Sequence, residues 1–155
     1  KVRAICVSNF QAGRFFDFAH YVDVKPMVNQ LQCNVMIQQQ GIEAVHSEFG
    51  TKMMAWGPLG GQGVDGIVMS EELAAIGAKY GKSAAQVALR WLTQRGIVAI
   101  PKSVHKERME QNYNVLDFSL TDEDMAQIAK MNQHDTGTIN FGDPQFVKYL
   151  IQNYG

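Results

Sequence analysis

The sequence predicts an α/β fold built around a parallel sheet. Four short apolar runs with the character of buried strands alternate with segments whose apolar residues recur at helical spacing. Turn or capping residues separate most of these segments. Strands that alternate with helices usually pair in parallel, and ligands of such sheets bind at the carboxyl ends of the strands.

The first half of the chain is expected to form three strands and two helices. Gly50 follows the second helix at the position where glycine commonly ends one. The third strand leads into the glycine-rich loop 57–66, whose backbone can approach a ligand closely. The expected elements are a strand buried on both faces at 4–7, a helix at 11–20, a strand at 27–35, a helix at 38–49 and a strand at 51–56.

The second half carries stronger helix-start signals. Ser70 is a good N-cap, and Ser83 with Gln86 has the spacing of a capping box. The residues from Thr121 to Asp124 give a similar start to a last helix. The expected elements are helices at 71–80 and 84–95, a strand at 97–100, a helix from residue 103 onward, a helix after residue 121 and an irregular tail at 133–155.

Polar residues gather where the predicted strands end. A right-handed winding of strand-helix units brings the carboxyl ends of parallel strands to one rim of the sheet, so these residues are expected to form one site. After the fourth strand, two cations, a hydroxyl and two amides lie near a helix start, a combination suited to phosphate and a base. The rim residues are Ser8, Asn9, Gln30, Trp56, Gly57, Lys102 and Ser103, joined by Arg108, Gln111 and Asn112.

Composition excludes several classes of protein. The 155 residues, 46% of them hydrophobic, suffice for one domain with a sizeable core, and the formal net charge of -1 gives no footprint for nucleic acid or an acidic membrane surface. Cys6 and Cys33 lie in apolar runs and are expected to be buried, reduced thiols of a cytoplasmic protein, although a bridge between them stays open. No apolar run is long enough to span a membrane. The histidines lack metal-ligand spacing, so no metal is expected; they are His20, His46, His105 and His134.

Four separated motifs resemble the successive signatures of the aldo-keto reductases. These are VSNF at 7–10, VNQ at 28–30, WGPLG at 56–60 and IPKS at 100–103, followed by Arg108 and QN at 111–112. The resemblance runs from residue 1 to about residue 132 and implies a (β/α)8 TIM barrel, of which this chain matches only the second half. Residues 1–132 are therefore expected to be a half barrel of about four strand-helix units with an extra helix, and residues 133–155 a tail near the substrate rim.

The resemblance implies a nicotinamide dinucleotide site along the rim. Ser8, Asn9 and Gln30 would hold the carboxamide, and Trp56, where most relatives have tyrosine, would stack under the nicotinamide ring. Leu59 and Gly60 would let the loop backbone approach the pyrophosphate. Because both cations are present, NADP is favoured over NAD. Lys102, Ser103 and Arg108 would take the 2′-phosphate, with Gln111 and Asn112 on the adenine edge.

The catalytic tetrad of aspartate, tyrosine, lysine and histidine that the resemblance implies lies upstream of residue 1. No catalytic residue is assigned in this chain, because Tyr21, Tyr80 and Tyr113 fall on helices or helix ends. We expect the chain alone to be inactive and the missing half to come from an upstream segment or a second chain. A separate match to G-x-G-x-x-G at 61–66 lacks the adjoining helix and acid of a Rossmann motif and is interpreted as accidental.

Two functional classes follow from these observations. The first is an NADPH-dependent reductase of small aldehydes or ketones, with this chain as its cofactor-binding half. The second is a non-catalytic half barrel that binds a nucleotide or another protein. The coding sequence upstream of Lys1 discriminates them: a frame with the tetrad favours the first, and a start codon favours the second.

Overall fold

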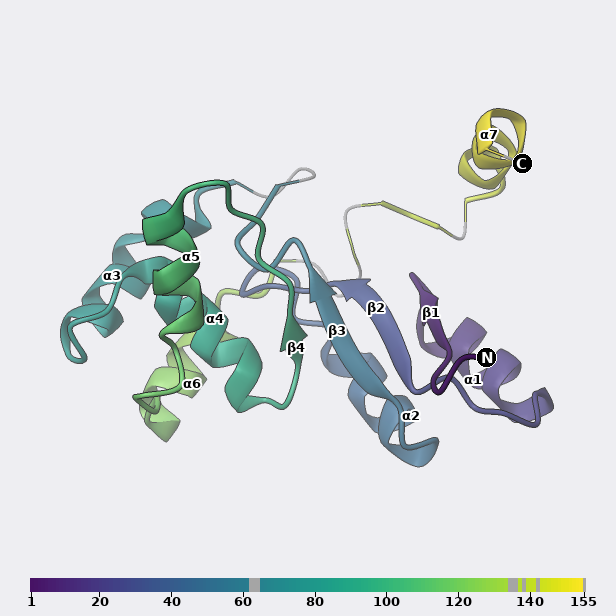
Figure 1. Ribbon diagram of the computed structural model, residues 1–155, viewed down its shortest axis with the longest axis horizontal. Helices are drawn as coiled ribbons and strands as arrows, with labels where there is room; N and C mark the ends of the chain where they lie inside the picture. Colours follow the sequence, from purple (N-terminus) through teal and green to yellow (C-terminus); the bar gives the residue numbers. More distant parts are fainter. Residues whose placement is uncertain (62–64, 134–136, 138, 142, 155) are drawn as a thin grey trace.

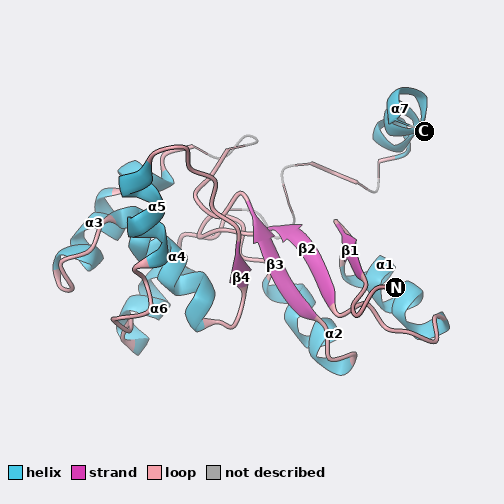
Figure 2. Ribbon diagram, viewed as in Figure 1, coloured by secondary structure: helices cyan, strands magenta, loops and turns pink. Residues whose placement is uncertain are grey.

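A computed structural model describes residues 1–61, 65–133, 137, 139–141 and 143–154. Its centre is a four-stranded parallel sheet in the order β1-β2-β3-β4, as the alternation of strands and helices predicts (Figures 1 and 2). The strands are short, and β4 contributes only two residues to the ladder. They are β1 (Cys6–Ser8), β2 (Val28–Gln32), β3 (Lys52–Trp56) and β4 (Val98–Ala99).

The helices begin where the sequence places caps. The Ser70 hydroxyl accepts from the Leu73 amide at 3.3 Å, and the capping boxes opened by Ser83 and Thr121 both form. The α-helices are α1 (Ala12–Tyr21), α2 (Glu43–Glu48), α3 (Glu71–Ala78), α4 (Ala84–Gln94), α5 (Lys106–Tyr113), α6 (Asp122–Ala129) and α7 (Pro144–Tyr154). Two 3-10 turns, η1 (Gln40–Ile42) and η2 (Ile67–Met69), precede α2 and α3.

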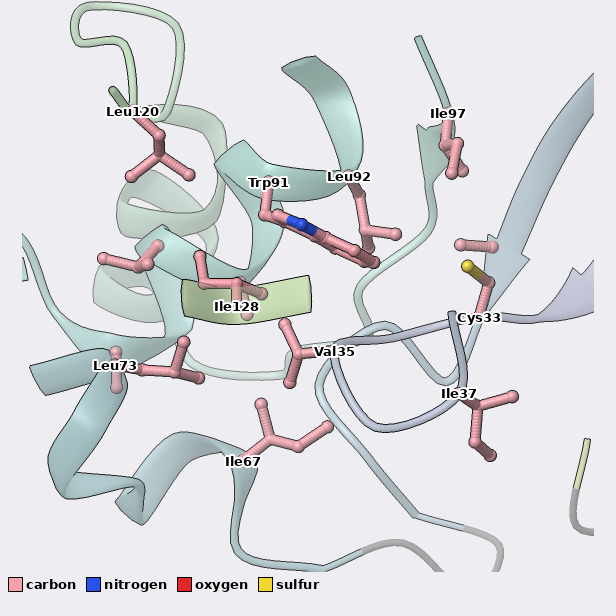
Figure 3. Close-up of a cluster of buried hydrophobic side chains, with 14 of the residues drawn as sticks. Cys33, Val35, Ile37, Ile67, Leu73, Trp91, Leu92, Ile97, Leu120 and Ile128 are labelled. Atoms are coloured by element: carbon pink, nitrogen blue, oxygen red, sulfur yellow. The ribbon is translucent and has the colours of Figure 1, made fainter. Parts of the chain in front are cut away.

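The core lies between one face of the sheet and the helices. Alternate strand residues such as Leu31, Met53 and Ala55 are buried against this side. Beyond the strands, Figure 3 shows Trp91 and Leu92 of α4 among apolar side chains from the loops, α3 and α6. Burial of these apolar side chains holds the strands against α4.

The opposite face of the sheet is largely uncovered. In Figure 1, α1 and α2 lie behind the strands, and no helix covers the front of β2 and β3. Cys6, expected to be buried, is exposed, and the strand expected to be buried on both faces at 4–7 is instead β1 with an exposed pattern. The reason is that β1 is an edge strand whose front face no other element of the described chain covers. Cys33 is buried and free as predicted, and burial raises the pKa of its thiol to about 12.

Three further predictions are corrected. The helix expected at 38–49 begins later, because Gln39 has φ 54° and cannot belong to a right-handed helix; η1 starts at Gln40 and α2 follows from Glu43. The helix expected from Ser103 begins at Lys106, and Ser103 lies in the turn before it. The tail expected to be irregular contains α7, which Asp143 opens by accepting from the Gln145 amide at 2.9 Å with Pro144 in the first helical position.

Among the described residues, no helix is both long and apolar enough to cross a membrane, and no cluster of potential ligands could hold a metal ion. His20 and His105 are exposed, whereas His134 lies outside the described residues. His46 is only 3% exposed and packs edge-on against Phe15 at 4.8 Å between ring centroids. The expectation of packing or surface histidines therefore holds for the three that are described.

His46 makes the stability of the fold sensitive to acid. Its Nε2 accepts from the Asn29 amide at 3.0 Å, and burial lowers its pKa to about 4 from 6.5. The folded state binds this proton less readily than the unfolded state, so the stabilisation is complete above about pH 6.5 and is lost as the pH falls toward 4. Between about pH 7 and pH 4.5, His46 should therefore lower the unfolding free energy of the unmodified protein by about 2 kcal/mol. We expect His46→Gln to lack this decrease when both proteins are unfolded in urea at the two pH values.

The control is His20→Gln, since His20 lies exposed on α1. This variant should show the same acid sensitivity as the unmodified protein. An unchanged pH dependence in His46→Gln would contradict the assignment.

Candidate functional site

Four of the predicted rim residues form one hydrogen-bonded network. The Ser8 hydroxyl donates to the Gln30 carbonyl at 3.1 Å, and the Asn9 side-chain amide donates to the Ser8 Oγ at 3.1 Å. The Trp56 Nε1 donates to the Asn9 Oδ1 at 3.0 Å. The carboxyl ends of β1, β2 and β3 are therefore connected through side chains as well as through the sheet, with the indole half-exposed at their centre.

The register of the sheet explains why these side chains meet. Ser8 lies beside Gln30, and Gln30 beside Met54, in adjacent parallel strands. Parallel neighbours point to the same face, so all three lie on the uncovered side. The Gln30 Nε2 also contacts the Met54 Sδ at 3.2 Å. An amide and a hydroxyl on one exposed row can offer both donors and acceptors to a bound polar group.

Asn9 holds a backbone conformation that few residues adopt. Its φ is 60°, in the left-handed region, where asparagine is among the best tolerated residues after glycine. The Asn9 amide N–H donates to the Gln30 carbonyl at 2.9 Å, which fixes this turn against β2. The turn directs the side chain toward Trp56, so the strained backbone and the indole hydrogen bond belong to the same local structure.

The loop after β3 is a tight glycine turn. Gly57 has φ 60° and Gly60 has φ 100°, and the Gly60 amide donates to the Gly57 carbonyl at 3.1 Å. The buried Asn34 side chain donates to that same carbonyl at 3.1 Å and holds the loop against the segment that follows β2. Leu59 packs against the core, which leaves the Gly60 backbone at the surface of the turn. Residues 62–64 of the G-x-G-x-x-G match lie outside the described residues.

The junction between β4 and α5 carries the predicted cations. Ser103 is half-buried, and its hydroxyl accepts from the His105 amide at 3.1 Å and donates to the His105 carbonyl at 3.2 Å. Lys102 is exposed before this turn, and Arg108 is exposed in the first turn of α5. Within the described part of the chain, neither cation lies in an ion pair, whereas Lys106 pairs with Glu110 at 3.7 Å.

Gln111 and Asn112 occupy the last turns of α5, exposed and half-buried respectively. The described structure thus separates the predicted site residues into two groups. One is the network of Ser8, Asn9, Gln30 and Trp56, and the other is the turn and helix after β4. The loop of Leu59 and Gly60 follows β3, the strand that pairs with both β2 and β4.

The sequence pattern did not identify every residue that shapes the rim. The bond between Trp56 and Asn9, and the support of the loop by Asn34, appear only in the structure. Asn34 did carry a signal, since a polar residue inside an apolar run needs a buried partner. Nothing in the sequence indicates which partner it takes.

Comparison with known proteins decides the family. The aldo/keto reductase family model matches residues 1–133. This chain belongs to the aldo/keto reductase family. A relative from Trypanosoma cruzi, the 9,11-endoperoxide prostaglandin H2 reductase, is 41% identical over 86% of this chain and 47% of its own length. The glyoxal reductase of Bacillus subtilis is 39% identical over 87% of this chain and 48% of its own.

Solved aldo-keto reductases share the fold. An enzyme from a deep-sea metagenome library matches with a TM-score of 0.86 and 34% identity, over 92% of this chain and 53% of the other. A Bombyx mori aldo-keto reductase in complex with NADP matches with a TM-score of 0.81 and 33% identity, over 92% of this chain and 48% of the other. The chain thus spans about half the length of these relatives, and its four parallel strands are part of a TIM barrel.

The conformation of Asn9 gives a test of this aldo/keto reductase rim. Asn9→Gly loses the hydrogen bonds to Ser8 and Trp56 and should cost about 1 kcal/mol of stability. Asn9→Ala loses the same bonds but keeps a Cβ in the left-handed region, where glycine has none, so it should cost about 1 kcal/mol more than Asn9→Gly. Thermal unfolding measures the difference, and equal losses for the two variants would show that the backbone at Asn9 is not constrained.

Proposed function

We propose that this chain is the cofactor-binding half of an NADPH-dependent reductase that converts small aldehydes or ketones to alcohols. The observation that carries the proposal is the network that joins Ser8, Asn9, Gln30 and Trp56 at the carboxyl rim of the sheet. The same chain carries two cations after β4, Lys102 and Arg108, which form no ion pair with a described residue. Membership of the aldo/keto reductase family supports the reaction class. NADPH, when bound, supplies the hydride.

The network suits the nicotinamide end of the cofactor. A carboxamide has both donors and acceptors, and Ser8, Asn9 and Gln30 offer a hydroxyl and two amides on one rim. The N–H bond to Asn9 fixes one edge of the Trp56 indole and leaves the ring half-exposed for stacking. In this proposal these side chains orient the ring, and none of them donates a proton.

The turn after β4 suits the phosphate and adenine end. Lys102 and Arg108 are exposed and lie in no ion pair with a described residue, so their charges are available to a dianionic 2′-phosphate. Ser103 adds a hydroxyl that the turn already holds in place. Leu59 and Gly60 would border the pyrophosphate, and Gln111 and Asn112 would meet the adenine edge. The NADPH and NADP complexes of solved relatives support this choice of cofactor.

We propose that the proton donor comes from another part of the protein. Among the described tyrosines, Tyr80 donates its hydroxyl to Asp124 between α3 and α6, away from the rim strands. We therefore propose that residues 1–132 act with an upstream half barrel that carries the tetrad, and that residues 133–155 border the substrate. The chain alone would bind without catalysing the reduction.

The two edges of the sheet support a missing half. Near β1 lies a cavity of about 330 Å³. Its apolar lining includes Val2, Ile5, Val24 and Met27. At the other edge, Val98 and Ile100 are 46% and 42% exposed, and both belong to or adjoin β4. A closed barrel pairs its edge strands and buries their apolar neighbours. Exposed apolar residues at both edges are what one half of such a barrel leaves uncovered.

The 2′-phosphate assignment predicts a difference between the two nicotinamide cofactors. Lys102→Met or Arg108→Ala should weaken NADPH binding about tenfold or more, because each loses a charge-assisted contact, and should leave NADH nearly unchanged. Quenching of tryptophan fluorescence in the protein that contains both halves measures the two dissociation constants.

Lys106→Met provides the matched control, since Lys106 is a cation of α5 that already pairs with Glu110. It should change neither constant by more than about twofold. Equal weakening of NADPH and NADH by Lys102→Met would refute the 2′-phosphate role. A protein that reduces no aldehyde or ketone with NADPH once both halves are present would favour the non-catalytic alternative.

The missing half predicts the behaviour of the chain in isolation. Without a partner, the uncovered sheet face and both edges should bind an apolar dye and promote association, seen in dye fluorescence and in light scattering after size exclusion. Joining the chain to an upstream half should abolish most of the dye signal. A dilute monomer that binds no dye would contradict the half-barrel proposal.

A further inference from the structure

The helix that carries the adenine-end residues is weakly anchored. No residue of α5 is buried, and its N-cap residue, His105, makes no side-chain capping bond. Packing therefore contributes little to holding α5 on the body of the protein. Any ligand that depends on α5 needs another interaction to keep this helix in place.

Gln86 supplies that interaction. It lies in the first turn of α4, is only 8% exposed, and its Nε2 donates to the Gln111 carbonyl at 3.2 Å and to the Asn114 carbonyl at 3.0 Å. These carbonyls lie at the carboxyl end of α5, where helix acceptors are short of intrahelical donors, although the Gln111 carbonyl also accepts from the Asn114 amide at 3.2 Å. One buried amide thus connects the first turn of α4 with the last turn of α5.

The other end of the same amide is fixed by the capping box. The Gln86 Oε1 accepts from the Ser83 backbone amide at 3.1 Å and from the Ser83 hydroxyl at 3.2 Å. The amide is therefore oriented: a flip would turn its oxygen toward two carbonyls and its NH₂ toward an N–H. Lys82 adds a longer contact, from Nζ to the Asn114 carbonyl at 3.3 Å, beside its ion pair with Asp117 at 2.7 Å.

We propose that Gln86 is a positioning residue for the adenine end of the cofactor. It acts through α5 on Arg108, Gln111 and Asn112, and makes no contact with the cofactor itself. This inference rests on the proposed function, because it assumes that α5 meets the adenosine 2′-phosphate. It assigns a binding role to a buried side chain that the sequence presents only as part of a helix cap.

Gln94 provides a matched control on the same helix. Its Nε2 donates to the Leu120 carbonyl at 2.9 Å, and its Oε1 accepts from the Leu120 amide at 3.0 Å. It is also a glutamine that links α4 to a neighbouring segment, but the segment precedes α6 and carries none of the proposed site residues. Replacing either glutamine removes the same kind of contact, and only one of them should affect the cofactor.

The test uses the protein with both halves and three ligands: NADPH, 2′,5′-ADP and the reduced nicotinamide mononucleotide. Gln86→Met should weaken NADPH and 2′,5′-ADP by the same factor of about tenfold, and leave the mononucleotide unchanged. Gln86→Glu keeps the acceptor for Ser83 and loses the donor to α5, so it should weaken 2′,5′-ADP to a similar degree. Gln94→Met should change none of the three by more than about twofold.

Amide hydrogen exchange gives a second readout that does not need a ligand. The amides of α5 should exchange faster in Gln86→Met than in Gln94→Met, because only the first loses the link to this helix. Equal binding losses in the two variants, or normal 2′,5′-ADP binding in Gln86→Glu, would overturn the positioning role. If the unmodified protein binds neither NADPH nor 2′,5′-ADP, the proposed function itself is refuted, and this outcome differs from a failure of Gln86 alone.

Discussion

The register of the parallel sheet is the constraint on which the rim depends. Ser8 meets Gln30, and Gln32 lies beside Trp56, only because β1, β2 and β3 pair without a slip. A shift of one residue would turn every side chain of a strand to the other face. Burial of Leu31 and Ala55 against the helices resists such a shift, so the apolar face of the sheet sets the chemistry of the exposed face.

The same alternation gives the sheet a second, uncovered face. It carries Gln30 and Met54, lies opposite α1 and α2, and is not enclosed by further strands of the described residues. Exposed Cys6 and Val98 mark the two edge strands. The residues proposed to bind the nicotinamide are therefore on the surface that the proposed second half of the barrel would cover. Cofactor binding and closure of the barrel should consequently favour each other.

Local signals in the sequence were sufficient for most helices and for the rim. Ser70, Ser83 and Thr121 cap helices through their own side chains, so a short motif contains the cause of each helix start. The order of strands followed from alternation, because short right-handed crossovers leave few other topologies. Positions at strand ends were likewise predictable, since a strand end is a property of the local sequence.

The features that the sequence did not predict depend on contacts between distant residues or on strands that no neighbour covers. The exposure of Cys6 follows from the edge position of β1 and its uncovered face in the described structure, which an apolar run in the sequence does not indicate. The pairing of Trp56 with Asn9 joins residues 47 positions apart. The last helix, α7, does have a local signal in Asp143 and Pro144, but the glycines around it suggested an irregular tail. Prediction from the sequence was therefore limited by contacts between distant residues, by uncovered strands and by conflicting local signals.

The two ends of the proposed cofactor site are supported in different ways. The nicotinamide end is built on β1, β2 and β3, which pair with one another in register, so its geometry follows that of the sheet. The adenine end is built on α5, which buries no side chain and is tied to α4 through Gln86 and to Lys82, the residue before the N-cap of α4. Hydride transfer requires accurate placement of the nicotinamide, whereas the adenosine phosphate contributes mainly binding energy. A rigid sheet at one end and a tethered helix at the other would let affinity change through α4 and α5 while the reacting ring keeps its place.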